Sequence, residues 1–288
     1  MNLCQPSVVR SLMEEAGIAF RREYGQNFLI DQSVPERIAD SCADRRDLLV
    51  LEVGPGIGCL TQELAHRYEK VVAVEIDRGL LPILAKTLGE YPNVKVINGD
   101  IMEIDLAALI AEEAEGRDAV VCANLPYYIT TPILMRVLES GVPFRSLTVM
   151  VQSEVAARLA AKPGSADYGA ITAVLGYYGT ARRLFTVPAG CFMPAPKVSS
   201  AVVRIDLYDE KPYKPQNEKL FFETVRAAFG QRRKTLLNAL GSIGLALSKE
   251  HLAAAIEAAG ISPTLRGERL STEEFVRLSD ALAAASTL

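Results

Sequence analysis

Asn124, Leu125, Pro126 and Tyr127 follow one another and together offer two hydrogen-bond acceptors and an aromatic face. Pro126 favours an extended conformation at Leu125, which keeps the Leu125 carbonyl out of helical hydrogen bonds. This carbonyl and the Asn124 amide oxygen can hold both hydrogens of an adenine amine and localise the lone pair on its nitrogen. The Tyr127 ring can stack on the base, a contact worth about 1–3 kcal/mol. The motif favours group transfer to a base amine, although an Asn-Pro turn with a packed tyrosine is the simpler interpretation.

Such a transfer needs alignment more than acid, base or metal chemistry. A methyl group on a sulfonium is already electrophilic, and alignment of reactants can contribute roughly 7–11 kcal/mol. Phe192 precedes a segment stiffened by Pro194 and Pro196, and its ring can cover the second face of the base or lie buried in the core. Because the base must be unstacked, we expect loops, bulges or unpaired ends of RNA as substrates. We expect no metal, because a sulfonium already makes the methyl group electrophilic.

A glycine-rich turn after a predicted strand indicates a nucleotide cofactor. Glycines at this point let the backbone approach a ligand closely. The three glycines of the turn are Gly54, Gly56 and Gly58. Glu75 ends the next predicted strand, where a carboxylate can accept both hydrogen bonds of a ribose diol. Asp100 ends the third strand and can accept a hydrogen bond from the adenine amine of the cofactor, although a turn-forming aspartate explains it equally well.

The glycine spacing and the available acid-base residues distinguish a nicotinamide dinucleotide from S-adenosylmethionine, the two cofactors that fit such a turn. The turn reads G-x-G-x-G and lacks the third glycine of the G-x-G-x-x-G pyrophosphate turn of nicotinamide dinucleotide enzymes. Hydride transfer also needs an acid or base, and the candidates for that role are His66 and His251. Both fall in predicted helices, where a surface or packing role explains them better than catalysis. We therefore expect S-adenosylmethionine as the cofactor.

The elements that position these residues alternate between β-rich runs and helix-period segments. The expected strands are 48–53, 70–75, 94–98, 119–122 and 146–151, and the helices between them are 59–68, 79–89, 106–115 and 131–139. This order predicts an α/β fold, a Rossmann-like methyltransferase sheet that is mostly parallel. Residues 183–187 and 201–207 have no helix between them and predict an antiparallel edge hairpin.

A polar, proline-bearing segment around 208–217 predicts a linker between two domains. We expect 1–208 to be the cofactor-binding catalytic domain, with a helical extension at 1–45, and 209–288 to be a small all-helical domain that docks RNA. Apolar residues recur at helical spacing in 218–229, 234–240, 249–259 and 272–284, with Ser271 as a helix cap.

The overall charge weighs against a nucleic-acid partner unless basic residues are clustered. The net charge is -4 and the pI is about 5.5, whereas phosphate binding usually leaves a basic footprint. Basic clusters occur at Arg21-Arg22, Arg182-Arg183 and Arg232-Arg233-Lys234. Each alone is typical of a solvated surface. We assign RNA contacts to Arg21, Arg22, Arg232, Arg233 and Lys234.

Apolar runs and cysteines indicate the compartment. The longest apolar stretches are far shorter than the roughly 20 residues of a membrane span, and charged residues interrupt every candidate signal sequence. The five cysteines are odd in number and contain no C-x-x-C pair, which argues against a disulfide framework or a zinc site. We expect a cytoplasmic protein with reduced thiols and no membrane association.

Five ordered motifs, spread over nearly the whole chain, resemble the KsgA/RsmA family of bacterial small-subunit ribosomal RNA adenine N6,N6-dimethyltransferases. The motifs are GQNFLID at 25–31, LEVGPGIG at 51–58, NLPY at 124–127, FMPAPKV at 192–198 and FGQRRKTL at 229–236. Together they are far more specific than any one of them.

The resemblance implies a function and a set of contacts. It implies dimethylation of two adjacent adenines near the 3′ end of 16S ribosomal RNA, linked to small-subunit assembly, with the small ribosomal subunit as partner. Separately from the resemblance, we expect a monomer. The implied cofactor contacts are Asn27, Leu29, Gly54, Glu75, Asp100 and Asn124. Two positions depart from the family pattern, Ala170 where an arginine is usual and Ser199 where an aspartate is frequent, which affects the expected RNA contacts but leaves the cofactor pocket unchanged.

Other functions remain open at this point. A related enzyme that methylates a large-subunit adenine and confers macrolide resistance shares the fold and an N-x-P-Y motif, although Leu125 and the basic tail favour the small subunit. A non-catalytic ribosome assembly or transcription factor would not need intact cofactor residues. A small-molecule methyltransferase would not explain the basic helical tail.

Overall fold

The computed structural model describes residues 1–18, 26–231 and 233–286, so the predicted RNA contacts Arg21, Arg22 and Arg232 lie outside the described residues. The chain divides into two compact units. The first comprises Met1–Ala156 and Arg182–Asp209, and the second comprises Ala157–Ala181 and Glu210–Leu288. The predicted linker coincides with the boundary at Asp209, whereas residues 157–181, expected in the catalytic domain, belong to the second unit.

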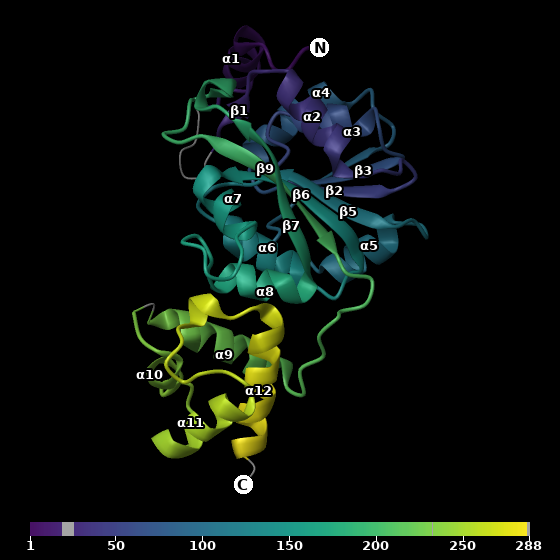
Figure 1. Ribbon diagram of the computed structural model, residues 1–288. Helices are drawn as coiled ribbons and strands as arrows, with labels where there is room; N and C mark the ends of the chain where they lie inside the picture. The colour runs from purple at the N-terminus through teal and green to yellow at the C-terminus, as the bar shows by residue number, and fades with distance from the viewer. Residues whose placement is uncertain (19–25, 232, 287–288) are drawn as a thin grey trace. The chain divides into compact units, whose positions relative to one another are not determined.

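The first unit is built on a seven-stranded sheet with the order β4-β3-β2-β5-β6-β9-β7 (Figure 1). Its strands are β2 (Leu49–Val53), β3 (Lys70–Glu75), β4 (Val94–Asn98), β5 (Ala119–Asn124), β6 (Phe144–Gln152), β7 (Gly179–Val187) and β9 (Ser200–Leu207). Strands β4, β3, β2, β5 and β6 run parallel, and β9 pairs antiparallel with β6. The mostly parallel sheet with an antiparallel edge is confirmed.

Helices cover both faces of this sheet. In Figure 1, α2, α3 and α4 lie on one face and α5 and α6 on the other. Their bounds, with those of the N-terminal helix and the short helices of this part of the chain, are α1 (Pro6–Glu15), α2 (Ser33–Cys42), α3 (Cys59–Ala65), η2 (Arg78–Leu80), α4 (Leu81–Leu88), α5 (Leu106–Glu113), α6 (Thr130–Leu138), α7 (Ser153–Leu159) and η3 (Ala189–Cys191). The crossovers between parallel strands thus contain the helices that the sequence predicts, with shorter ends.

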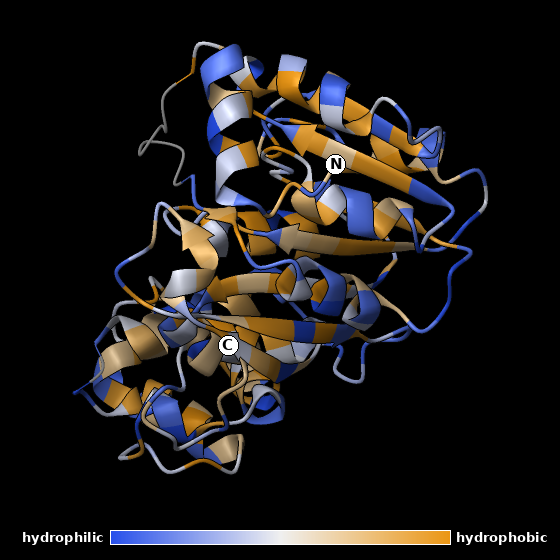
Figure 2. Ribbon diagram, turned by 90° about the horizontal axis from the view of Figure 1, so that it is seen from above, coloured by the Kyte–Doolittle hydropathy of each residue, from blue (hydrophilic) through white to orange (hydrophobic). Residues whose placement is uncertain are grey.

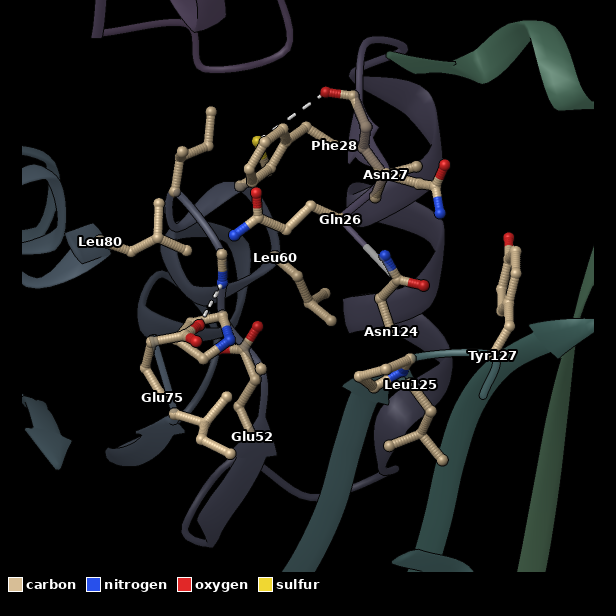
Figure 3. A pocket seen from close by; sticks show the side chains of 18 of the residues that line it. Gln26, Asn27, Phe28, Glu52, Leu60, Glu75, Leu80, Asn124, Leu125 and Tyr127 are labelled. Atoms are coloured by element: carbon tan, nitrogen blue, oxygen red, sulfur yellow. Dashed lines mark hydrogen bonds between the residues drawn. The ribbon is translucent and has the colours of Figure 1, made fainter. Parts of the chain in front are cut away.

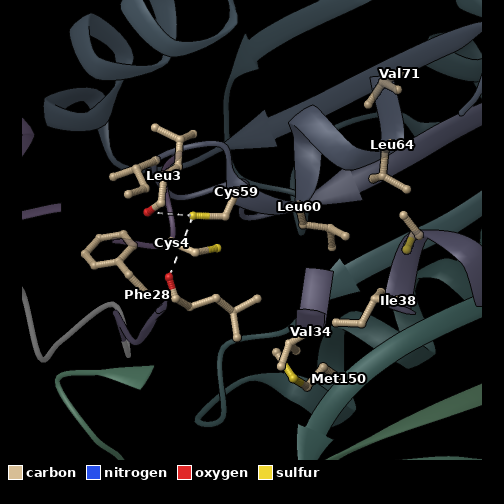
Figure 4. Close-up of a cluster of buried hydrophobic side chains, with 14 of the residues drawn as sticks. Leu3, Cys4, Phe28, Val34, Ile38, Cys59, Leu60, Leu64, Val71 and Met150 are labelled. Atoms are coloured by element: carbon tan, nitrogen blue, oxygen red, sulfur yellow. Dashed lines mark hydrogen bonds between the residues drawn. The ribbon is translucent and has the colours of Figure 1, made fainter. Parts of the chain in front are cut away.

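The central strands are buried on both faces because they are almost entirely apolar. All five residues of β2 are buried, as are the first five of β5, which is the pattern of a strand covered by helices on both sides. Figure 2 shows this as mostly orange strands with blue residues gathered on helices and loops. Ile38, Leu64 and Val71 are fully buried in the core cluster between the sheet and its helices (Figure 4).

A two-residue ladder joins segments far apart in the sequence. β1 (Phe28–Leu29) pairs antiparallel with β8 (Phe192–Met193), with Leu29 opposite Phe192. The Ile30 amide extends the ladder by donating to the Cys191 carbonyl at 2.8 Å. The ladder places the 26–29 segment beside the proline-stiffened loop, an arrangement that the sequence interpretation did not include.

The second unit is helical and packs around aromatic side chains. Its helices are α8 (Ala170–Tyr178), α9 (Glu218–Gly230), α10 (Leu236–Leu240), α11 (Lys249–Ala258), η4 (Gly267–Arg269) and α12 (Thr272–Ser286). Tyr177 of α8 packs its ring against Phe221 of α9 at 5.1 Å, and the Tyr168 hydroxyl donates to the Leu270 carbonyl at 2.8 Å. The predicted cap is present, because the Ser271 hydroxyl accepts from the Glu274 amide at 3.2 Å.

None of the helices within the described residues combines the length and apolar character needed to cross a membrane. All five cysteines are free thiols.

Candidate active site

A pocket opens where the parallel strands β2, β3 and β5 end, the place where open α/β sheets hold ligands. It brings together most of the residues that the sequence assigns to cofactor and catalysis. Those that line it are Asn27, Leu29, Gly54, Gly56, Glu75, Asn124, Leu125, Pro126 and Tyr127. Figure 3 shows Glu52 and Glu75 together on one side of the opening and Asn124 on the other.

The glycine turn between β2 and α3 has a backbone that other residues rarely adopt. Gly54, Gly56 and Gly58 have φ of 71°, 62° and 97°, in the left-handed region that favours glycine. A Cβ on Gly56 would also lie 3.1 Å from the Phe28 ring. Because these residues have no Cβ, the backbone of the turn is accessible from the pocket, as the sequence predicts.

Glu75 is tied into this turn. Its two carboxylate oxygens accept from the Gly56 amide at 3.2 Å and from the Asp77 amide at 2.8 Å. Asp77 in turn accepts from the Gln26 side chain at 2.9 Å. Burial raises the pKa of Glu75, and these amide donors oppose that rise. The carboxylate is thus fixed in position at the end of β3, beside the glycine turn.

Asn124 is the last residue of β5, and its side-chain amide makes no hydrogen bond with any described residue. The backbone after it is held in place, because the Leu125 amide donates to the Met150 carbonyl at 3.1 Å and the Pro126 carbonyl accepts from the Thr130 hydroxyl at 3.0 Å. A fixed backbone, with a side-chain amide that is directed at the pocket (Figure 3) and not used in hydrogen bonds within the described part of the chain, suits a residue that binds a ligand.

Tyr127 is anchored by its hydroxyl. That hydroxyl lies 2.5 Å from the Ser200 hydroxyl at the start of β9, and burial raises the pKa of the phenol. The ring is half-buried and lines the pocket beside Tyr128, which is 59% exposed. The hydroxyl end of the ring is therefore fixed. The ring that we expect to stack on the target base is part of the wall of the pocket.

Two predicted residues have other surroundings. Asp100 does not line the pocket, and its carboxylate accepts from the Met102 amide at 2.9 Å, as a turn-forming aspartate does. Phe192 is 2% exposed and belongs to the hydrophobic core next to β1. The roles assigned to them in cofactor and base binding stay predictions.

The predicted RNA contacts Arg233 and Lys234 lie in the second unit, between α9 and α10, and both are exposed. Among the described residues, no group of three or more His, Cys, Asp or Glu is placed to hold a metal ion.

The sequence interpretation missed several residues that line the pocket, including Gln26, Glu52, Ile76 and Tyr128. Gln26 is part of the first motif of the resemblance, and Tyr128 directly follows the fourth. Glu52 had a signal of its own, since it is the one carboxylate in the apolar run Leu-Val-Leu-Glu-Val of β2.

Comparison with known proteins gives a consistent result. Residues 17–284 match the family model described as ribosomal RNA adenine dimethylase. The chain is 48% identical over 282 residues to ribosomal RNA small subunit methyltransferase A of Alkaliphilus metalliredigens, covering 98% of each chain. It is also 48% identical to the protein of the same name from Geobacillus thermodenitrificans, over 98% of this chain and 97% of the relative.

Solved structures support the fold. The 23S rRNA methyltransferase ErmE aligns with a TM-score of 0.67 and 28% identity, over 89% of this chain and 100% of that one. A dimethyladenosine transferase from Plasmodium falciparum aligns with a TM-score of 0.73 and 22% identity, over 87% and 95% of the two chains.

Proposed function

Because the chain belongs to the ribosomal RNA adenine dimethylase family, we propose that it uses S-adenosylmethionine to dimethylate two adjacent adenines near the 3′ end of 16S ribosomal RNA. The chain is an rRNA adenine dimethyltransferase. The observation that carries the choice of reaction is the juxtaposition of Glu75 and Asn124 across one pocket. We also propose that the protein acts during assembly of the small ribosomal subunit, which contains the 16S RNA. We propose the cytoplasm as the compartment of the protein.

The charge of the pocket supports this cofactor. The described residues that line it include two acidic side chains, Glu52 and Glu75, and no lysine or arginine. S-adenosylmethionine carries a sulfonium and an ammonium against one carboxylate and is therefore cationic. A nicotinamide dinucleotide carries a pyrophosphate, which the buried Glu75 carboxylate would repel. The pocket thus fits the first cofactor on electrostatic grounds that the sequence pattern alone did not offer.

Several residues of the pocket have a part in the proposed reaction. Glu75 would hold the ribose hydroxyls, and the glycine turn would let the cofactor lie against the backbone. Asn124 and the Leu125 carbonyl would accept the two amine hydrogens of adenine, and Tyr127 would stack on its ring. When bound, S-adenosylmethionine supplies the electrophilic methyl group. The protein then contributes chiefly alignment, and the amine proton leaves after transfer.

The rival function is methylation of the large-subunit RNA. It has some support in the likeness to ErmE, at 28% identity. The small-subunit methyltransferases are much more similar, at 48% identity over nearly the full chain. We therefore favour the small ribosomal subunit as partner. We further propose a monomer as the acting species.

Mapping of the methylated nucleotide tests the proposal. Unmethylated small subunits and, separately, large subunits are incubated with the protein and methyl-labelled S-adenosylmethionine, and the labelled nucleotide is located by primer extension and mass spectrometry. We expect dimethyladenine at two adjacent positions near the 3′ end of 16S RNA. Label confined to the large subunit, or no label in either, would refute the proposed function.

We propose that 209–288 docks RNA through Arg233 and Lys234, and we predict an effect of both on salt dependence. Replacing both with glutamine should reduce the slope of log Kd against log salt by about 1.4 to 1.8, at roughly 0.7–0.9 per lost phosphate contact. Filter binding of 16S RNA between low and moderate salt measures the slope. The double variant Lys219→Gln and Lys249→Gln removes equal charge from exposed positions of the same unit and should leave the slope unchanged. Equal slopes for the two double variants would exclude Arg233 and Lys234 from the interface.

A further inference from the structure

Tyr127 is hydrogen-bonded to a serine that lies two strands away in the sheet. The tyrosine follows β5, whereas Ser200 is the first residue of β9, and β6 lies between these two strands. The two hydroxyl oxygens are 2.5 Å apart, so the loop after β5 is tied across β6 to β9. Ser200 is fully buried, whereas the Tyr127 ring is half-buried and lines the pocket on the same side as Asn124 (Figure 3). The bond thus connects a wall of the pocket to the interior of the sheet.

Ser200 is held in place by the backbone around it. It stands opposite Gln152 in the antiparallel pairing of β9 with β6. Just before it, the Ser199 carbonyl accepts from the Ser153 amide at 3.0 Å, and the hydroxyl oxygens of these two serines lie 2.8 Å apart. The start of β9 therefore has little freedom to move, and the Ser200 hydroxyl offers a fixed point to its partner.

The Tyr127 side chain has one polar atom, and that atom is the one that bonds Ser200. Burial raises the pKa of the phenol, so at neutral pH it stays protonated and either hydroxyl can donate. Because the hydroxyl is at the far end of the side chain, a hydrogen bond there sets the direction in which the whole ring points. The backbone at the near end is also held, since the Leu125 amide donates to the Met150 carbonyl. The ring therefore has little freedom to swing away from the pocket wall.

We propose that Ser200 is a positioning residue for methyl transfer, which holds the Tyr127 ring in the orientation that stacks on the target adenine. This inference rests on the proposed function. Ser200 is buried and absent from the pocket lining, so it acts through the tyrosine hydroxyl rather than on the RNA or the cofactor. Alignment is the chief contribution that we assign to the protein. A ring that can swing would let the base adopt orientations in which its amine is away from the methyl group.

A double-mutant cycle tests this role. We expect Ser200→Ala to lower the rate of methyl transfer by about tenfold, the size of effect that one hydrogen bond can have. Tyr127→Phe keeps the ring but removes its hydroxyl, and it should lower the rate by a similar factor. Because both variants remove the same interaction, the double variant should also be only about tenfold slower than the wild type. An effect of Ser200 that bypasses this hydroxyl would be equally large in both backgrounds, and the double variant would be about 100-fold slower.

Single-turnover assays with unmethylated small subunits and saturating S-adenosylmethionine measure the rate. Calorimetric titration measures the cofactor affinity, which should stay within about twofold of the wild type in all variants, because only the placement of the base changes. Ser146→Ala is the matched control. It removes another buried serine hydroxyl from the same sheet, one that donates to the Cys42 carbonyl at 3.3 Å, and it should retain the wild-type rate.

Thermal unfolding checks that each variant is folded. The role of Ser200 is overturned by a wild-type rate in Ser200→Ala, by losses that multiply in the double variant, or by an equal loss in Ser146→Ala. Each of these outcomes leaves the proposed function intact, because the wild type still methylates the small subunit in the same assay. Should Ser200→Ala not fold, Tyr127→Phe decides: a loss of about tenfold supports the proposal, and a wild-type rate overturns it. Absence of methylation by the wild type overturns both.

Discussion

Replacing Asn124 with alanine should lower kcat for methyl transfer by about 1000-fold while cofactor affinity stays within about threefold of the wild type. The expected loss equals about 4 kcal/mol of transition-state stabilisation, well within what alignment of reactants can contribute. The physical reason lies in the free amide of Asn124, which has no hydrogen bond to any described residue and is available to the target amine. The cofactor keeps its other contacts, above all those of Glu75 and the glycine turn.

Single-turnover assays with unmethylated small subunits measure the rate, and calorimetry with S-adenosylmethionine measures the affinity. Asn124→Asp is the matched variant, since it keeps an acceptor oxygen in nearly the same place and should retain more activity than alanine. Wild-type turnover in Asn124→Ala would remove the residue from the proposed chemistry. A large loss of cofactor affinity with unchanged kcat would make Asn124 a cofactor contact instead.

Local patterns were enough to predict the sheet and the place of the pocket. The apolar runs ending at Val53 and Glu75 became β2 and β3, and the glycine turn took the positive φ values that glycine alone adopts easily. Once the strands are parallel, their carboxyl ends must share an edge. The meeting of Gly54, Glu75 and Asn124 follows from that geometry, which is why the lining of the pocket could be anticipated.

Long-range pairing could not be anticipated in the same way. The β1–β8 ladder has two residues in each strand, too few for any periodic signal, and it joins Leu29 to Phe192 across most of the chain. Residues 157–181 joined the helical unit because Tyr168 and Tyr177 find partners on α9 and just before α12. Both outcomes depend on contacts between distant segments, and no property of the segments themselves reveals them.

Burial was the second quantity that the sequence left open. Phe192 could cover a base or lie in the core, and only the structure places it at 2% exposure. Glu52 was visible as a carboxylate in an apolar strand, but only the arrangement of Thr61 and Glu75 around it shows that its Oε2 has no hydrogen-bond partner among the described residues. Whether a buried polar group has a hydrogen-bond partner depends on the folded structure, so the sequence alone does not reveal it.

Glu75→Gln should weaken S-adenosylmethionine binding by about 100-fold, or about 2.7 kcal/mol, because hydrogen bonds to a charged group contribute about 1.5–3 kcal/mol each. The carboxylate accepts from the Gly56 and Asp77 amides with one oxygen each, and it lines the pocket. An amide would turn an NH2 group toward one of these two donors, so the turn would lose an acceptor. It would also remove a negative charge from a pocket proposed to hold a cation.

Calorimetric titration gives the affinity. The value of kcat at saturating cofactor should fall by less than about tenfold, because Glu75 lies on the other side of the pocket from Asn124 (Figure 3). Glu103→Gln is the matched control, since it removes an exposed carboxylate after β4 and should leave both quantities unchanged. If Glu75→Gln bound the cofactor as tightly as the wild type, the ribose could not be held at the end of β3. The cofactor would then have to lie in the pocket in another orientation, and Asn124 would no longer be next to its methyl group.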